Sequence, residues 1–313
     1  MNTYELLKSD RAVDVYTNKD VVLHIVNKVS INNEVYLGVL NQYRYAQNLG
    51  EIAIYMSSIP LSDNIIIPKT INCGESDSSY WKMEEYLDGQ TFTESKQIIE
   101  LDTFREVIFW CRNLHQSKNR LIKDKPLINF YDDRLEALKS LDQKMPDVYF
   151  DLADKLLKNI SNCIGENDKI ANIHGDLSGS NLIYMDKKTG IIDFEQGLYG
   201  GDPFADLDKL LQLEISLYPP LNINKLDYDP KLTKIEKFEL INEYFDSLNN
   251  HKQDCSRIDD IEILNLRHNL IYSESILRAL FSRYFLDYIG IEALNYEIVE
   301  YMESLIGDVY ERF

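Results

Sequence analysis

The stretch Ile173–Asp208, IHGDLSGSNLIYMDKKTGIIDFEQGLYGGDPFADLD, decides the fold, because three short motifs follow one another in it at characteristic spacing. The first motif, His174–Asp176, is followed by Asn181 and then by a second acidic motif, Ile192–Phe194. Each motif is common alone, so the weight lies in their order. The ordered set has the layout of a metal-assisted phosphoryl-transfer centre, with one catalytic acid, an amide and a second acid.

A hairpin is predicted between Asn181 and Asp193. Two apolar runs are separated there by the polar, glycine-containing run Asp186–Gly190, which is typical of a hairpin loop. Because a hairpin returns the chain on itself, Asn181 and Asp193 are expected to lie side by side. Their amide and carboxylate oxygens suit Mg²⁺. Asp176 lies just ahead of this pair, placed to accept a proton from an incoming hydroxyl.

These motifs resemble those of the aminoglycoside phosphotransferase and choline kinase-like small-molecule kinases. The resemblance rests on His174–Asp176 with Asn181, on Ile192–Glu195, and on Gly201–Pro203 with Asp206–Leu207. It implies an α+β, two-lobed protein kinase-like fold. Residues 1–86 would form a small antiparallel β-sheet N-lobe with one helix, and residues 87–313 a larger, mainly α-helical C-lobe.

The resemblance also implies roles for single residues. Asp176 would be the catalytic base, Asn181 and Asp193 would bind magnesium, and Asp206 would be a structural anchor under the catalytic loop. ATP and Mg²⁺ would be the cofactors. We expect His174 to order the loop by hydrogen bonding instead of carrying protons. The alternative is that these tripeptides are ordinary loops with acids on a solvated surface, which requires order and spacing to be accidental.

A hinge between the lobes is predicted at the end of the strand-like run Tyr80–Glu84. In the resembling kinases, a strand that ends in such a sequence pairs with the adenine edge through its backbone. Glu85, Tyr86 and Leu87 are therefore the nucleotide-binding candidates. The alternative is a plain strand end, closed by an Asp-Gly turn.

The N-terminal region departs from the family pattern at the phosphates. Kinases of this kind usually carry a glycine-rich loop between their first two strands, where a side chain would crowd the phosphates. This chain has no glycine before Gly38. The positions that would have to serve instead are Ser9–Ala12 or Thr17–Asp20.

The lysine expected on the third strand is also not evident. If Glu34–Leu40 is that strand, the lysine slot falls near Gly38; if Val21–Val26 is, it falls near His24. We favour the first alignment, because it leaves room for three strands before a helix near residues 42–57. Glu51 then becomes the helix acid that normally pairs with the lysine. Lys28 or Arg44 is left to supply the positive charge, unless both are solvated surface residues.

The rest of the chain reads as helical. Thr91 and Glu94 have capping-box spacing. A buried helix face is predicted from the i, i+3, i+4, i+7 spacing of Phe104, Val107, Ile108, Cys111, Leu114 and His115. A second helix, near residues 261–289, is apolar nearly all round and is expected in the middle of a lobe.

The amino-acid composition restricts the kinds of partner that are expected and the expected location in the cell. The 313 residues are 44% hydrophobic and 27% charged, as in soluble globular proteins. The net charge of −19 disfavours nucleic acid and anionic membrane as partners and favours a cationic small molecule, although acidity can also serve solubility alone. The 4 scattered cysteines, with no secretory signal or apolar spanning run, predict a cytoplasmic protein. A monomer or a homodimer is expected.

The predicted function is therefore ATP- and Mg²⁺-dependent transfer of the γ-phosphate to a hydroxyl of a small, cationic molecule. The acceptor would be an aminoglycoside-like antibiotic or a choline-like or sugar-like alcohol. The alternative is a non-catalytic, nucleotide-binding pseudokinase with a regulatory role, motivated by the missing glycine loop and lysine. The complete set of Asp176, Asn181 and Asp193 favours the enzyme.

Overall fold

The computed structural model of the protein describes residues 5–9, 13–27, 59–77, 79–95, 99–117, 125–140, 151, 154–155, 164, 168–194, 200–211 and 232–249. These residues belong to two compact units, one formed by 1–121 with 172–200 and the other by 122–171 with 201–313. The candidates Lys28, Arg44 and Glu51 lie outside the described residues, as do the segments predicted at 34–40, 42–57 and 261–289. The division into lobes at residue 86 stays a prediction.

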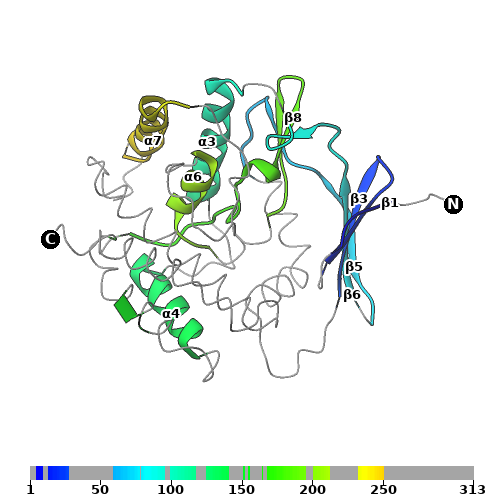
Figure 1. The fold of residues 1–313 in the computed structure, drawn as a ribbon, viewed down its shortest axis with the longest axis horizontal. Coiled ribbons are helices and arrows are strands. Elements are labelled where there is room, and N and C mark those ends of the chain that lie inside the picture. The colour runs from blue at the N-terminus through cyan, green and yellow to red at the C-terminus, as the bar shows by residue number, and fades with distance from the viewer. Residues whose placement is uncertain are drawn as a thin grey trace, which may run out of the picture. The chain divides into compact units, whose positions relative to one another are not determined.

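A five-stranded antiparallel sheet opens the first unit, in the order β1-β2-β3-β6-β5 (Figure 1). Its strands are β1 (Glu5–Ser9), β2 (Val13–Thr17), β3 (Val21–Asn27), β5 (Thr70–Glu75) and β6 (Ser79–Glu85). The antiparallel N-terminal sheet and the α+β class are thus confirmed.

The third strand of this sheet is β3, and the preferred alignment of the sequence is wrong. Two strands, β1 and β2, already precede Val21, so the lysine slot falls near His24 and not near Gly38. The early strands were hard to recognise because Glu5, Lys8 and Asp14 interrupt their apolar pattern. Glu5 and Lys8 lie on β1, the edge of the sheet, where charges discourage pairing with another chain.

The segment Thr17–Asp20 is the turn between β2 and β3. The Asn18 Oδ1 accepts hydrogen bonds from the N–H groups of Asp20 and Val21, each at 3.0 Å. Lys19 takes the left-handed conformation that the turn needs, with φ 72°. Of the two candidate phosphate loops, only Ser9–Ala12 therefore joins the first two strands, and its residues 10–12 lie outside the described part of the chain.

A second sheet of the first unit contains the predicted hairpin. Its order is β4-β9-β8-β7, with β4 (Ile65–Ile66), β7 (Gln90–Thr91), β8 (Leu182–Met185) and β9 (Lys188–Ile191). The hairpin is confirmed, but its turn is tighter than predicted. Only Asp186 and Lys187, with φ 22° and 72°, form the turn, as in the two-residue turns with positive φ that suit hairpins.

Gly190 belongs to strand β9 and not to the hairpin loop. A Cβ atom at this position would lie 2.5 Å from Leu87 Cδ1. The glycine is therefore needed for close packing against the end of the predicted hinge.

Helix α3 (Leu101–Gln116) packs the core of the first unit. All six residues predicted for its buried face are buried, and Trp110, which the sequence pattern did not single out, joins them at 0% exposure. The capping box of Thr91 and Glu94 forms, with reciprocal hydrogen bonds of 3.2 and 3.1 Å. It closes a turn well before α3 begins.

The described part of the second unit is mainly helical, with α4 (Leu127–Ser140), α6 (Pro203–Leu211) and α7 (Lys234–Asn249) (Figure 1). Asp202 caps α6, since its Oδ1 accepts the N–H of Phe204 at 2.9 Å, and Pro203 fits the first helical position. Tyr131 donates to the other oxygen of Asp202 at 3.1 Å. The Gly201–Pro203 motif thus starts a helix. Among the described residues, no helix is long and apolar enough to cross a membrane.

Candidate active site

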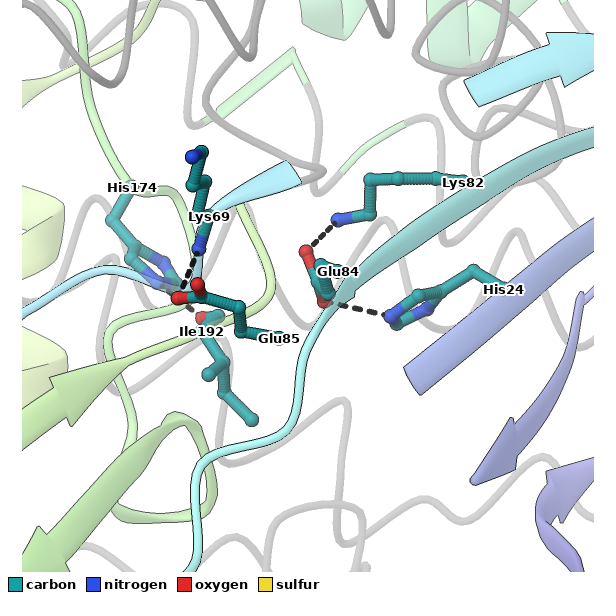
Figure 2. A network of polar contacts seen from close by, with 7 residues as sticks. All are labelled: His24, Lys69, Lys82, Glu84, Glu85, His174 and Ile192. Carbon is teal, nitrogen blue, oxygen red and sulfur yellow. Dashed lines mark hydrogen bonds and ion pairs between the residues drawn. The ribbon is translucent and has the colours of Figure 1, made fainter. Parts of the chain in front are cut away.

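His174 orders the loop in front of the hairpin through both of its ring nitrogens. Nδ1 accepts the N–H of Asp176 at 3.2 Å, so Nε2 carries the proton and donates to the carbonyl oxygen of Ile192 at 2.8 Å (Figure 2). The ring is fully buried and lies against Trp110 and Phe194, with centroids 6.3 and 4.9 Å away. These contacts support the structural role predicted for His174.

Asp176 and Asn181 are in direct contact. The Asn181 Nδ2 donates to the carbonyl oxygen of Asp176 at 2.7 Å and to its carboxylate Oδ2 at 3.2 Å. The short 3-10 helix Gly179–Asn181 brings them together, and the positive φ of Gly175, 84°, lets the chain turn ahead of Asp176. The Asp176 side chain is half-buried, which leaves its carboxylate partly open to solvent.

Asp193 lies at the other end of the hairpin and beside Asn181. The N–H of Ile192 donates to the carbonyl oxygen of Asn181 at 3.0 Å, while His174 binds the carbonyl of the same Ile192 residue. The hairpin therefore brings the predicted pair together. Asp193 has φ 65°, a left-handed conformation that aspartate tolerates better than most residues and that is enriched at functional sites.

The donor set of this loop fits a magnesium ion. Both bonds that Asn181 makes to Asp176 use its amide nitrogen, so its Oδ1 is not consumed by them. Asp193 adds a half-buried carboxylate from the neighbouring position. Amide and carboxylate oxygens are among the ligands that Mg²⁺ prefers.

The predicted hinge follows directly after β6. Two of its N–H groups are already used, since Glu85 donates to the carbonyl of Lys69 at 3.0 Å and Tyr86 to that of Asp20 at 3.1 Å. In the described part of the chain, the N–H of Leu87 has no such partner. Of the three predicted residues, Leu87 is therefore the one whose backbone N–H is not already used by another described backbone group.

The sheet carries a polar cluster that the sequence did not reveal: His24 on β3 and Lys82 and Glu84 on β6. Glu84 Oε1 lies 2.8 Å from His24 Nε2, and Oε2 lies 2.7 Å from Lys82 Nζ (Figure 2). Burial by itself raises the pKa of the Glu84 carboxyl. The charge of Lys82 and the hydrogen bond from His24 outweigh burial and lower that pKa from 4.5 to about 2.

Ionised Glu84 is therefore expected to stabilise the fold in a pH-dependent way. Its folded pKa lies below its unfolded value, so the stabilisation is complete above about pH 4.5 and is lost as the pH falls towards about 2. The full effect is on the order of 3 kcal/mol. Urea unfolding of wild type and Glu84→Gln should show a stability difference that shrinks by this amount on acidification. A difference independent of pH would contradict it.

Asp206 lies in the second unit, in the first turn of α6, and is fully buried. An acid in the first turn stabilises a helix through the positive end of its dipole. The anchoring of the catalytic loop by Asp206 stays a prediction, as do the roles assigned to Asp176, Asn181 and Asp193.

With a sheet ordered β1-β2-β3-β6-β5, the protein has the protein kinase-like fold of the aminoglycoside phosphotransferases. ADP-bound aminoglycoside phosphotransferase APH(2'')-Ib shares it with a TM-score of 0.64 and 16% identity, over 98% of this chain and 94% of that chain. The gentamicin complex of APH(2")-IIa gives 0.58 and 16%, over 100% and 92%.

Spectinomycin phosphotransferase APH(9)-Ia, in complex with ADP and spectinomycin, gives a TM-score of 0.52 and 9% identity, over 99% of this chain and 92% of that chain. No protein-family model and no curated protein sequence matches the chain. At these identities the likeness concerns the fold, and it confirms the fold that the sequence motifs implied.

Proposed function

We propose that the protein is an ATP- and Mg²⁺-dependent small-molecule O-kinase, which transfers the γ-phosphate of ATP to a hydroxyl of its substrate. The observation that carries the proposal is the contact between Asn181 and Asp176, at 2.7 and 3.2 Å, together with the N–H of Ile192, the residue before Asp193, which donates to the Asn181 carbonyl oxygen at 3.0 Å. These contacts support the proposal, in which Asp176 is the proton acceptor and Asn181 and Asp193 are the magnesium ligands.

In this mechanism, Asp176 accepts the proton of the substrate hydroxyl and orients its oxygen. Asn181 and Asp193 would hold magnesium, which neutralises phosphate charge when bound. His174 fixes the loop by joining the Asp176 N–H to the Ile192 carbonyl. Phosphoryl transfer depends on positioning and charge stabilisation more than on covalent help, so these contacts address its main demands.

A cationic acceptor is favoured by charge and by the structural neighbours. The chain has a net charge of −19, which attracts cations. Solved neighbours with the same fold carry gentamicin, in APH(2")-IIa, and spectinomycin, in APH(9)-Ia. An aminoglycoside-like compound or a choline-like or sugar-like alcohol is therefore the proposed acceptor class. A cytoplasmic location fits such a reaction.

One observation supports the alternative that the protein is a pseudokinase. The third strand carries His24 where the resembling kinases carry a lysine, so the usual contact to the nucleotide phosphates is missing from β3. A pseudokinase would bind nucleotide without transferring phosphate.

The test is ADP formation from MgATP, measured across aminoglycosides, choline and small polyols. The proposal expects turnover that depends on one class of acceptor. If nucleotide shifts the melting temperature but no acceptor is phosphorylated, the pseudokinase is the better account. If no nucleotide shifts it, with or without magnesium, both accounts fail.

A further inference from the structure

Three ionisable side chains converge on one face of the N-terminal sheet. His24 and Lys82 are directly opposite each other in the β3–β6 ladder, and Glu84 follows Lys82 by two residues, so all three point to the same side. On this face Thr17, Lys82 and Glu84 are 4%, 6% and 7% exposed. On the other face, Met83 is half-buried and Glu85 exposed, so the cluster lies on the covered side of the sheet.

Stability alone is a weak reason for such a cluster. Moving charges from water into the interior of a protein is unfavourable, and apolar side chains of similar volume often stabilise a protein as well or better. Buried charge pairs with perturbed titration are enriched at functional sites. Lys82 is buried, whereas Lys19, Lys69, Lys187 and Lys188 of the same unit are exposed.

The position of Lys82 relative to the hinge is informative. Lys82 and Glu84 lie on strand β6, which ends at Glu85. The predicted nucleotide-binding segment begins at this residue. At ~3.3 Å per residue, Lys82 lies about 10 Å along the strand from Glu85. Lys82 pairs across the ladder with His24, and the lysine of the resembling kinases is expected near His24.

We infer that Lys82 binds the nucleotide phosphates, in place of the missing lysine on β3, and that Glu84 positions its ammonium group. The phosphate-binding lysine then lies on β6 instead of on the neighbouring strand β3. In protein kinases the phosphate-binding lysine is itself held by an acid on a helix. Here Glu84 Oε2, at 2.7 Å from Lys82 Nζ, serves as that acid, and His24 orients the carboxylate through Oε1.

The inference rests on the proposed kinase function and is tested on the full-length protein with a charge-matched double variant. Lys82→Met with Glu84→Gln removes both buried charges together, and a glutamine can still accept the hydrogen bond of His24. Affinities for MgATP and MgGTP, and for adenosine and guanosine, are measured by calorimetry. Loss of a charge-assisted contact should weaken triphosphate binding about 10- to 100-fold. Nucleoside binding should stay unchanged.

A further substitution tests whether the lost triphosphate affinity can be restored. Adding His24→Lys to the double variant places a lysine directly opposite position 82, in the slot of the resembling kinases. It should restore triphosphate affinity to within a few-fold of wild type. The control is Lys188→Met, because Lys188 is an exposed lysine of β9 outside the cluster, and it should alter neither affinity.

The outcomes separate cleanly. Unchanged triphosphate affinity in the double variant, or equal loss of triphosphate and nucleoside binding, would overturn the role of Lys82. Wild-type protein that binds no triphosphate would overturn the proposed function, and this inference with it. If the double variant does not fold, wild-type protein is labelled with an ATP acyl-phosphate instead. This reagent acylates lysine amines that lie against the bound phosphates. Acylation at Lys82 supports the inference, and acylation only at other lysines contradicts it.

Discussion

Asp176→Asn should strongly reduce phosphoryl transfer while leaving the fold and nucleotide binding intact. The amide is isosteric with the carboxylate, and Asn181 Nδ2 can still donate to the carbonyl of residue 176, which carries the shorter of its two bonds. What is lost is the group that accepts the hydroxyl proton, a contribution of about 10²- to 10⁴-fold. The measurement is acceptor-dependent turnover beside the melting-temperature shift produced by MgATP.

The control is Asp186→Asn, in the exposed hairpin turn. Asparagine suits positive φ as well as aspartate does, so this variant should behave as wild type. Turnover by Asp176→Asn equal to that of wild type would remove Asp176 from the role of base. Loss of the nucleotide-induced shift would instead point to a role in binding.

Asp193→Asn should raise the magnesium requirement and lower turnover at least about a hundredfold, because a metal acts mainly through charge and the substitution removes one negative ligand. Asparagine is chosen since it tolerates the left-handed backbone at this position, φ 65°, which alanine would strain. A magnesium titration of turnover gives both values. More magnesium should recover part of the lost activity.

Asp63→Asn is the matched control, because Asp63 is an exposed acid in a turn of the same unit. It should leave the magnesium dependence unchanged. A wild-type magnesium curve for Asp193→Asn would contradict the assignment of Asp193 as a ligand, whatever the level of turnover.

Local patterns in the sequence predicted the hairpin and the closeness of Asn181 to its ends, because both depend on residues near one another in the chain. The contact between Asn181 and Asp176 involves residues five positions apart, and the hairpin joins Asn181 to Ile192 through a tight turn. The buried face of α3 could be predicted because its spacing repeats every helical turn. Trp110 was missed, although it is fully buried against His174 and Phe194.

The sequence alone could not predict which residues pair between strands that are distant along the chain. The hydrogen bond between His24 and Glu84 spans 60 positions, and only the pairing of β3 with β6 brings the two together. The prediction of which strand is the third one was wrong for a related reason. The charged edge strand β1 lacks the apolar alternation that marks a core strand. Gly190 was read as a loop residue, because its neighbour Leu87 is distant in sequence and close only in the fold.

The most direct test of the account is whether the γ-phosphate of labelled ATP appears on an acceptor hydroxyl. Wild-type protein is incubated with magnesium, γ-phosphate-labelled ATP and the panel of aminoglycosides, choline and polyols, and the acceptors are analysed for covalent phosphate. We expect a phosphate monoester on one acceptor class, formed equally by wild type and by Asp186→Asn and about 10²- to 10⁴-fold more slowly by Asp176→Asn. Equal labelling by Asp176→Asn, or binding of ATP with no labelled acceptor, would contradict it.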